Sequence, residues 1–210
     1  MKTMQFGASG PVVSQFGIGA MSFAGIYGDA TEAESHAVLN ACHAAGVTHI
    51  DTSNVYGNGR SEEIIGAWFA QTPGARNDMH LATKAGITGK PDRRFNNDAD
   101  YLEECLDASL ARLGVDHVDL FYVHRYDSTH SPEALGATLQ RLIDSGKTRA
   151  VGLSEVAPAT LRRVATECPV AAVQSEYSLS TRAPELGLIQ ACAELDTTLV
   201  AFSPVGRAFL

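Results

Sequence analysis

Residues 47–63 read VTHIDTSNVYGNGRSEE, and this stretch decides the fold. Its first four residues are mostly apolar or β-branched, which favours a buried strand. The strand runs directly into Asp51, and a loop with two glycines then leads to Ser61, where a helical pattern begins. A strand followed by a helix is the basic unit of an α/β protein.

The same unit recurs along the rest of the chain. Seven short apolar runs are spaced as strands, at residues 16–21, 47–51, 79–84, 118–124, 149–154, 171–177 and 198–204. Amphipathic helical patterns lie between them; one of these carries a single leucine stripe, made of Leu102, Leu106, Leu110 and Leu113. Alternating strands and helices predict parallel strands that are joined by helical crossovers.

Signals for the ends of helices agree with this reading. Thr31 and Glu34 have the spacing of a capping box, which predicts that a helix begins there. Gly46, Gly114 and Gly146 each follow a helical stripe and precede a strand, as glycines do just after a helix end.

Two architectures accommodate repeated strand–helix units, a doubly wound open sheet and a closed barrel. The open sheet usually carries GxGxxG after its first strand, and neither FGIGAMSFAG (16–25) nor GNG (57–59) has that spacing. Polar residues at the carboxyl ends of the strands favour a (β/α)8 TIM barrel instead. We expect residues 1–210 to form a single barrel domain, with an N-terminal hairpin followed by about seven barrel strands.

Composition narrows the range of functions. The chain has 210 residues and a net charge of −8, which argues against a nucleic-acid partner or a basic membrane-binding patch. No stretch approaches the roughly 20 apolar residues of a membrane span, and the N-terminus lacks the apolar core of a signal peptide. The four cysteines form no CxxC and the histidines show no metal-binding spacing, so we expect a cytoplasmic protein without a metal.

Ionisable residues lie at the carboxyl ends of three consecutive predicted strands. These residues are Asp51, Lys84 and His124. In a parallel barrel such strand ends converge on one mouth, where barrel active sites are built. Tyr56 comes from the loop after Asp51 and would reach the same place. Because a buried carboxylate needs a partner, we expect Lys84 to pair with Asp51 beside this tyrosine.

This group of side chains suits one kind of chemistry. An unperturbed tyrosine has a pKa of about 10, and a nearby cation such as Lys84 lowers it by favouring the phenolate. Tyr56 could then give a proton to an alkoxide that forms at a substrate carbonyl, while His124 donates a hydrogen bond to the same oxygen. The pattern predicts reduction of a carbonyl by hydride from a bound cofactor, which the pattern alone does not identify.

At six places the chain resembles the aldo-keto reductase family. The matching stretches are DTSNVYGNGRSEEIIG, LATKAG, DLFYVHRYD, GKTRAVGLSE, QSEYSL and AFSPVGR. The resemblance implies that a small-molecule carbonyl substrate is reduced with NADPH, NADH being possible. It also implies that Tyr56 is the general acid, that Asp51 and Lys84 tune it, and that His124 assists.

The same resemblance implies a row of cofactor contacts along the strand ends. They are Ser154 and Gln174 for the nicotinamide carboxamide, Phe202 for the nicotinamide ring, Ser203, Val205 and Arg207 for the pyrophosphate, and Gly19, Ala20 and Met21 for the nicotinamide ribose.

Barrels of this family have eight strands, and the chain ends just after its seventh. We therefore expect a chain truncated before the eighth strand, without the basic residues that grip an adenosine 2′-phosphate. Because a fold does not fix a function, a non-catalytic regulatory subunit that binds nicotinamide nucleotides stays open as an alternative. The sequence assigns no oligomeric state.

Overall fold

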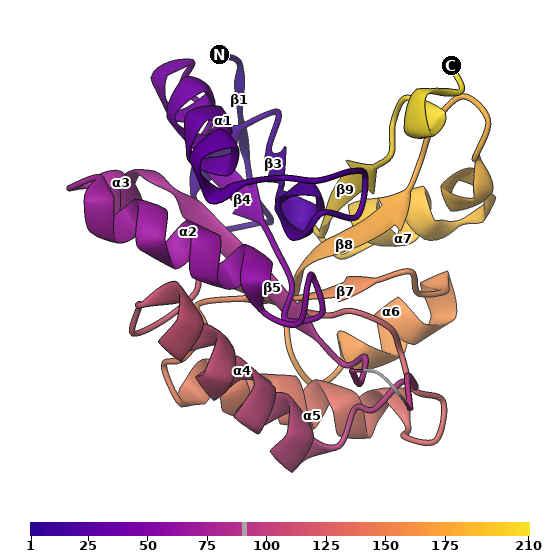
Figure 1. Cartoon of the computed structure of the whole chain (residues 1–210). Coiled ribbons are helices and arrows are strands. Elements are labelled where there is room, and N and C mark those ends of the chain that lie inside the picture. The colour runs from indigo at the N-terminus through magenta and orange to yellow at the C-terminus, as the bar shows by residue number, and fades with distance from the viewer. Residues whose placement is uncertain (90–91) are drawn as a thin grey trace.

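A computed structural model describes residues 1–89 and 92–210 (Figure 1). A two-stranded antiparallel hairpin comes first, and a seven-stranded sheet follows. The hairpin strands are β1 (Thr3–Gln5) and β2 (Val12–Ser14). The strands of the larger sheet are β3 (Ile18–Gly19), β4 (His49–Asp51), β5 (His80–Ala85), β6 (Leu120–Val123), β7 (Val151–Ser154), β8 (Val170–Glu176) and β9 (Thr198–Phe202).

The strands of the larger sheet lie side by side in chain order, and each is parallel to its neighbours. Figure 1 shows that this sheet is curled and that the helices lie around its outside. The helices are α1 (Glu32–Ala44), α2 (Arg60–Gln71), α3 (Ala75–Asp78), α4 (Ala99–Leu113), α5 (Pro132–Asp144), α6 (Pro158–Val164) and α7 (Leu188–Glu194). The described residues also form three short 3-10 helices, η1 (Ala20–Ala24), η2 (Ala183–Leu186) and η3 (Gly206–Ala208).

The predicted helix ends are confirmed. The Thr31 hydroxyl accepts a hydrogen bond from the Glu34 backbone N–H (3.2 Å), and the Glu34 carboxylate accepts one from the Thr31 N–H (2.9 Å). Gly46, Gly114 and Gly146 all have positive φ, at 79°, 66° and 76°. A helix that ends in this left-handed conformation turns sharply into the next strand, and only glycine adopts it without cost.

The first barrel strand is shorter than the sequence predicted. β3 ends at Gly19, and Ala20 and Met21 belong to the 3-10 helix η1. The carbonyl of Ala20 accepts a hydrogen bond from the Ser61 hydroxyl at 2.8 Å. This contact joins the chain, at the point where it leaves the strand, to the start of α2.

The core has two layers because side chains alternate along each strand. Leu120 and Tyr122 of β6 point into the curl, where they join Phe6 and Val13 of the hairpin segment. Their neighbours along β6 point outward and pack under the helices. The predicted leucine stripe of α4 is buried in this outer layer.

A pair of buried histidines links the hairpin segment to the sheet. His49 of β4 and His80 of β5 place their Nδ1 atoms 2.8 Å apart, and the Phe6 ring packs against both imidazoles. Such a bond needs one protonated and one bare nitrogen, which two neutral imidazoles can supply. Burial, and then the neighbouring His49, lower the pKa of His80 to about 4, and burial also lowers the pKa of His49.

We predict that acid weakens the fold through these histidines. Because the folded pKa of His80 lies below its ordinary value of 6.5, the unfolded chain binds more protons between the two values. Protonation of this histidine therefore does not lower the free energy of unfolding above pH 6.5. The free energy of unfolding decreases as the pH falls from 6.5 toward 4. Urea denaturation should show that the free energy of unfolding is lower at pH 5 than at pH 7.5, by on the order of 1–2 kcal/mol.

A His80→Phe variant should show a smaller loss over the same pH range, whereas His130→Gln, a loop substitution far from the pair in sequence, is the control. Equal stability at both pH values in the unsubstituted protein would contradict this reading of the pair.

Candidate active site

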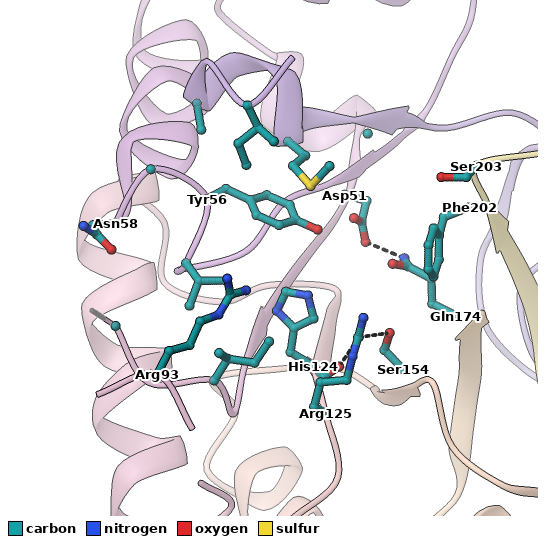
Figure 2. Close-up of a pocket in the computed structure, with 18 of the residues that line it drawn as sticks. Asp51, Tyr56, Asn58, Arg93, His124, Arg125, Ser154, Gln174, Phe202 and Ser203 are labelled. Carbon is teal, nitrogen blue, oxygen red and sulfur yellow. Dashed lines mark hydrogen bonds between the residues drawn. The ribbon is translucent and has the colours of Figure 1, made fainter. Parts of the chain in front are cut away.

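A pocket of about 770 Å³ opens at the carboxyl ends of the barrel strands (Figure 2). Strand-end residues Asp51, His124, Ser154, Gln174 and Phe202 line it together with the loops that follow those strands. This size is typical of pockets that hold small molecules and cofactors.

Lys84 lies beneath the pocket floor, and its side chain is fully buried. Its ammonium donates to three oxygens: the Asp51 carboxylate, the Thr52 carbonyl at 2.9 Å and the Tyr56 hydroxyl at 3.4 Å. An ammonium has three protons to donate, so this set satisfies it completely. The predicted pairing of Lys84 with Asp51 is present in the structure.

The charge of Lys84 survives its burial. Burial alone would lower the pKa of this amine, but the carboxylate of Asp51 and then Tyr56 outweigh it, and the pKa is raised. The other Asp51 oxygen accepts a hydrogen bond from the Gln174 side chain at 2.8 Å (Figure 2). Asp51 therefore ties β4 to both β5 and β8.

Tyr56 comes from the loop between β4 and α2. Three residues in a row after it have positive φ, namely Gly57 (62°), Asn58 (52°) and Gly59 (95°). A Cβ on Gly57 would also lie only 3.0 Å from the side chain of Ala24, so a glycine suits both the backbone and the space. The turn holds the Tyr56 ring in the pocket, where it meets His124 edge to face with centroids 5.8 Å apart.

His124 directly follows β6 and stays neutral. Its Nδ1 lies 3.0 Å from the hydroxyl oxygen of Ser53. Burial, and then the positive charges of Lys84, Arg125 and Arg93, lower the pKa of the imidazole to about 2. The imidazole can therefore donate or accept a hydrogen bond in this pocket, but it is not a cation at neutral pH.

The structure gathers most of the predicted cofactor residues around the same pocket. Seven of the nine line it: Gly19, Met21, Ser154, Gln174, Phe202, Ser203 and Arg207. Ala20 is buried behind the wall, and Val205 is 60% exposed and outside the pocket lining.

Two arginines that the sequence analysis did not single out also line the pocket. Arg125 donates to the Ser154 hydroxyl at 3.1 Å and to the His124 carbonyl at 2.5 Å. Figure 2 shows Arg93 and Arg125 near the imidazole of His124. The sequence did offer one indication that Arg125 lines the pocket, namely its position immediately after His124 at a strand end.

The chain that carries this site matches a known protein family. A model of the aldo/keto reductase family matches residues 15–210, and the chain is a member of that family.

Curated relatives carry the same family name. An aldo-keto reductase of Schizosaccharomyces pombe, whose name specifies NADP(+), is 43% identical over 204 residues, which are 94% of this chain and 60% of the relative. The aldo-keto reductase str7 of Strobilurus tenacellus is 42% identical, over all of this chain and 63% of its own length. The chain thus spans about 60% of the length of the curated relatives that it matches.

Solved structures agree on the fold. A glycerol dehydrogenase from Gluconobacter oxydans superposes with a TM-score of 0.88 at 25% identity, over 98% of this chain and 64% of that one. An aldo-keto reductase from Bacillus halodurans, in its holo form, gives 0.88 at 26% identity, over 99% and 67%. The predicted fold class is confirmed: the curled parallel sheet and its helices match the (β/α)8 barrels of this family.

Within residues 1–89 and 92–210, no helix combines the length and the apolar character that a membrane crossing requires. The same residues hold no group of three or more His, Cys, Asp or Glu side chains arranged for a metal ion.

We predict that Lys84→Met destabilises the protein as well as its site. The substitution leaves the Asp51 carboxylate without its counter-charge in a buried setting, which costs roughly 3–5 kcal/mol. Urea denaturation measures the change. Lys147→Met is the matched control, because that lysine is also paired, with the carboxylates of Glu103 and Asp107, but at the surface, where a pair contributes about 0–1 kcal/mol.

Adding Asp51→Asn to Lys84→Met should recover part of the lost stability, since it removes the unpaired charge. If Lys84→Met unfolds at the same urea concentration as Lys147→Met, the buried pair does not have the structural weight assigned to it.

Proposed function

We propose that the protein reduces aldehydes or ketones with NADPH, with Tyr56 as the general acid. The observation that carries this proposal is the contact of the buried Lys84 ammonium with the Tyr56 hydroxyl, beside the neutral imidazole of His124. Membership of the aldo/keto reductase family supports it, as does the NADP(+) in the name of the Schizosaccharomyces pombe relative.

The proton comes from Tyr56 in this proposal. A carbonyl oxygen bound between the Tyr56 hydroxyl and the His124 ring becomes an alkoxide as hydride reaches its carbon, and the phenol then protonates it. The Lys84 ammonium, 3.4 Å from the phenol oxygen, stabilises the phenolate that remains. Asp51 holds the ammonium in this place without touching the substrate.

His124 acts as a hydrogen-bond donor and not as the acid. With a pKa of about 2, its imidazole is neutral at neutral pH, so it has one N–H for a hydrogen bond and no second proton to transfer. A donor placed where negative charge develops stabilises the transition state more than the ground state. The two roles are therefore divided between a proton donor, Tyr56, and a fixed dipole, His124.

The pocket fits a nicotinamide cofactor. Ser154 accepts from Arg125 and keeps its own hydroxyl proton for a carboxamide oxygen, while Gln174 donates to Asp51 and keeps its carbonyl for a carboxamide N–H. Phe202 presents its ring at the pocket wall (Figure 2). Bound NADPH would supply the hydride.

The remaining predicted contacts extend from the nicotinamide site toward the chain end. Ser203 and Arg207 line the pocket and could bind the pyrophosphate, for which a guanidinium forms strong charge-assisted hydrogen bonds. Gly19 and Met21 would border the ribose, with Ala20 supporting them from behind. Val205 is exposed and does not line the pocket, so we assign it the weakest contact.

The proposal concerns the whole protein, of whose relatives this chain covers about 60%. We propose that residues 1–210 belong to a single barrel domain, that the protein acts in the cytoplasm, and that its substrate is a small carbonyl compound. NADH is the second cofactor to be tested.

Oxidation of NADPH in the presence of a panel of aldehydes and ketones tests the proposal. We expect turnover with at least one class of carbonyl compound and slower turnover with NADH at the same concentration. Cofactor binding without turnover of any compound in the panel would contradict the proposal and favour a regulatory nucleotide-binding subunit.

We predict that Tyr56→Phe lowers kcat by roughly 10²–10⁴-fold, the usual contribution of a general acid. The phenyl ring keeps the packing against His124 but has no proton to give, so the dissociation constant for NADPH should stay unchanged. Tyr27→Phe is the control, because Tyr27 lines the same pocket and plays no part in the proposed proton transfer. A Tyr56→Phe variant within twofold of the parent rate would remove Tyr56 from the mechanism.

A further inference from the structure

Ser53 lies directly behind the imidazole of His124. It is fully buried, two residues after Asp51, and its hydroxyl oxygen lies 3.0 Å from His124 Nδ1 and 3.1 Å from the Lys84 carbonyl oxygen. The reduction proposed above needs a hydrogen-bond donor on the His124 ring and gives Ser53 no task; with Nδ1 beside Ser53, the other ring nitrogen, Nε2, is left for the substrate.

The neutral ring carries one proton, on either Nδ1 or Nε2, and the hydrogen bond made by one nitrogen selects the state of the other. Ser53 also has one proton to donate. If the hydroxyl donates to the Lys84 carbonyl, Nδ1 must carry the ring proton and Nε2 faces the pocket bare. If the hydroxyl donates to Nδ1, the ring proton sits on Nε2 and faces the pocket.

The second arrangement leaves no backbone group unsatisfied. The Lys84 carbonyl already accepts a hydrogen bond from the Asn54 backbone N–H at 3.1 Å, so it does not depend on Ser53. Among the described residues, Ser53 is the one hydrogen-bond partner of His124 Nδ1. The serine hydroxyl is thus free to donate to Nδ1, and a bare Nδ1 would have no other donor among these residues.

A carbonyl substrate also favours the arrangement with the ring proton on Nε2. Its oxygen accepts hydrogen bonds and donates none, so it gains from His124 only when Nε2 carries a proton. The hydroxyl of Ser53 also serves better than a carboxylate would in this place. A carboxylate only accepts, and it would hold the ring proton on Nδ1.

We propose that Ser53 is a positioning residue, which donates its hydroxyl proton to His124 Nδ1 and so keeps the imidazole in the tautomer that presents Nε2–H to the carbonyl oxygen. The role that this assigns to Nε2–H rests on the proposed carbonyl reduction. The tautomer itself does not, because it is a property of the protein without cofactor or substrate.

Long-range ¹H–¹⁵N NMR of the cofactor-free protein reports which ring nitrogen of His124 is protonated. We expect Nε2–H in the unsubstituted protein and a loss of that state in Ser53→Ala. Ser61→Ala is the matched control: Ser61 is equally buried in the same region and bonds to Thr52 and to the Ala20 carbonyl, so its loss should leave the His124 tautomer in place. A proton on Nδ1 in the unsubstituted protein overturns the proposal, whatever any variant does.

Steady-state kinetics give the second readout. Ser53→Ala should lower kcat about 10-fold or more with an unchanged dissociation constant for NADPH. The variant leaves a buried ring nitrogen unsatisfied and removes the Nε2–H donor, and each change destabilises the transition state. Ser53→Thr retains the hydroxyl and should restore both the tautomer and most of the rate. If the methyl group of threonine prevents folding, Ser53→Cys, a weaker donor, should lie between serine and alanine in both readouts.

The outcomes separate this inference from the proposed function. An altered tautomer with an unchanged rate overturns the positioning role and leaves Tyr56 as the acid. An unaltered tautomer in Ser53→Ala overturns the inference and leaves the reductase untouched. Absence of turnover in the unsubstituted protein overturns the proposed function, while the NMR result still decides what Ser53 does to His124.

Discussion

The ammonium of Lys84 is the charge on which this structure depends. It is fully buried on strand β5, and burial of an isolated ammonium in a low-dielectric interior would be prohibitively costly. Three oxygens compensate for the lost water: the Asp51 carboxylate, the Thr52 carbonyl and the Tyr56 hydroxyl. Two of these come from the loop after β4, so satisfying the charge also fixes the loop that carries the tyrosine.

That requirement couples the site to the fold. Asp51 must face the barrel mouth to reach Lys84, and its second oxygen is held by Gln174 from β8. The Asp51 carboxylate therefore links β4 to β8, although β5, β6 and β7 lie between these two strands in the sheet. This network also holds the side chains above Asp51 in place, which suits the proposed proton and hydride transfer, because a preorganised site does not reorganise as charge develops.

Much of the fold and part of the site were predictable from local sequence. The leucine stripe of α4, the Thr31–Glu34 cap and the strand that ends at Asp51 depend on neighbours in the chain, and their patterns predicted them. The pairing of Asp51 with Lys84 followed from adjacent strand ends. The early end of β3 was not predicted, and the contact made there, between Ala20 and the Ser61 hydroxyl, joins residues 41 positions apart in the chain. Likewise the bond between Ser53 and His124 spans 71 residues and involves a residue type with no distinctive pattern.

The central claim, that Tyr56 and His124 bind the reacting oxygen together above Lys84, is tested most directly by a crystal structure of the protein with NADP(+) and an aldehyde substrate. This complex cannot react, because the oxidised cofactor has no hydride to give. The account predicts that the aldehyde oxygen lies within hydrogen-bonding distance of both the Tyr56 hydroxyl and His124 Nε2. An aldehyde oxygen bound away from these two atoms, in a complex whose crystals turn over when NADPH is added, would contradict it.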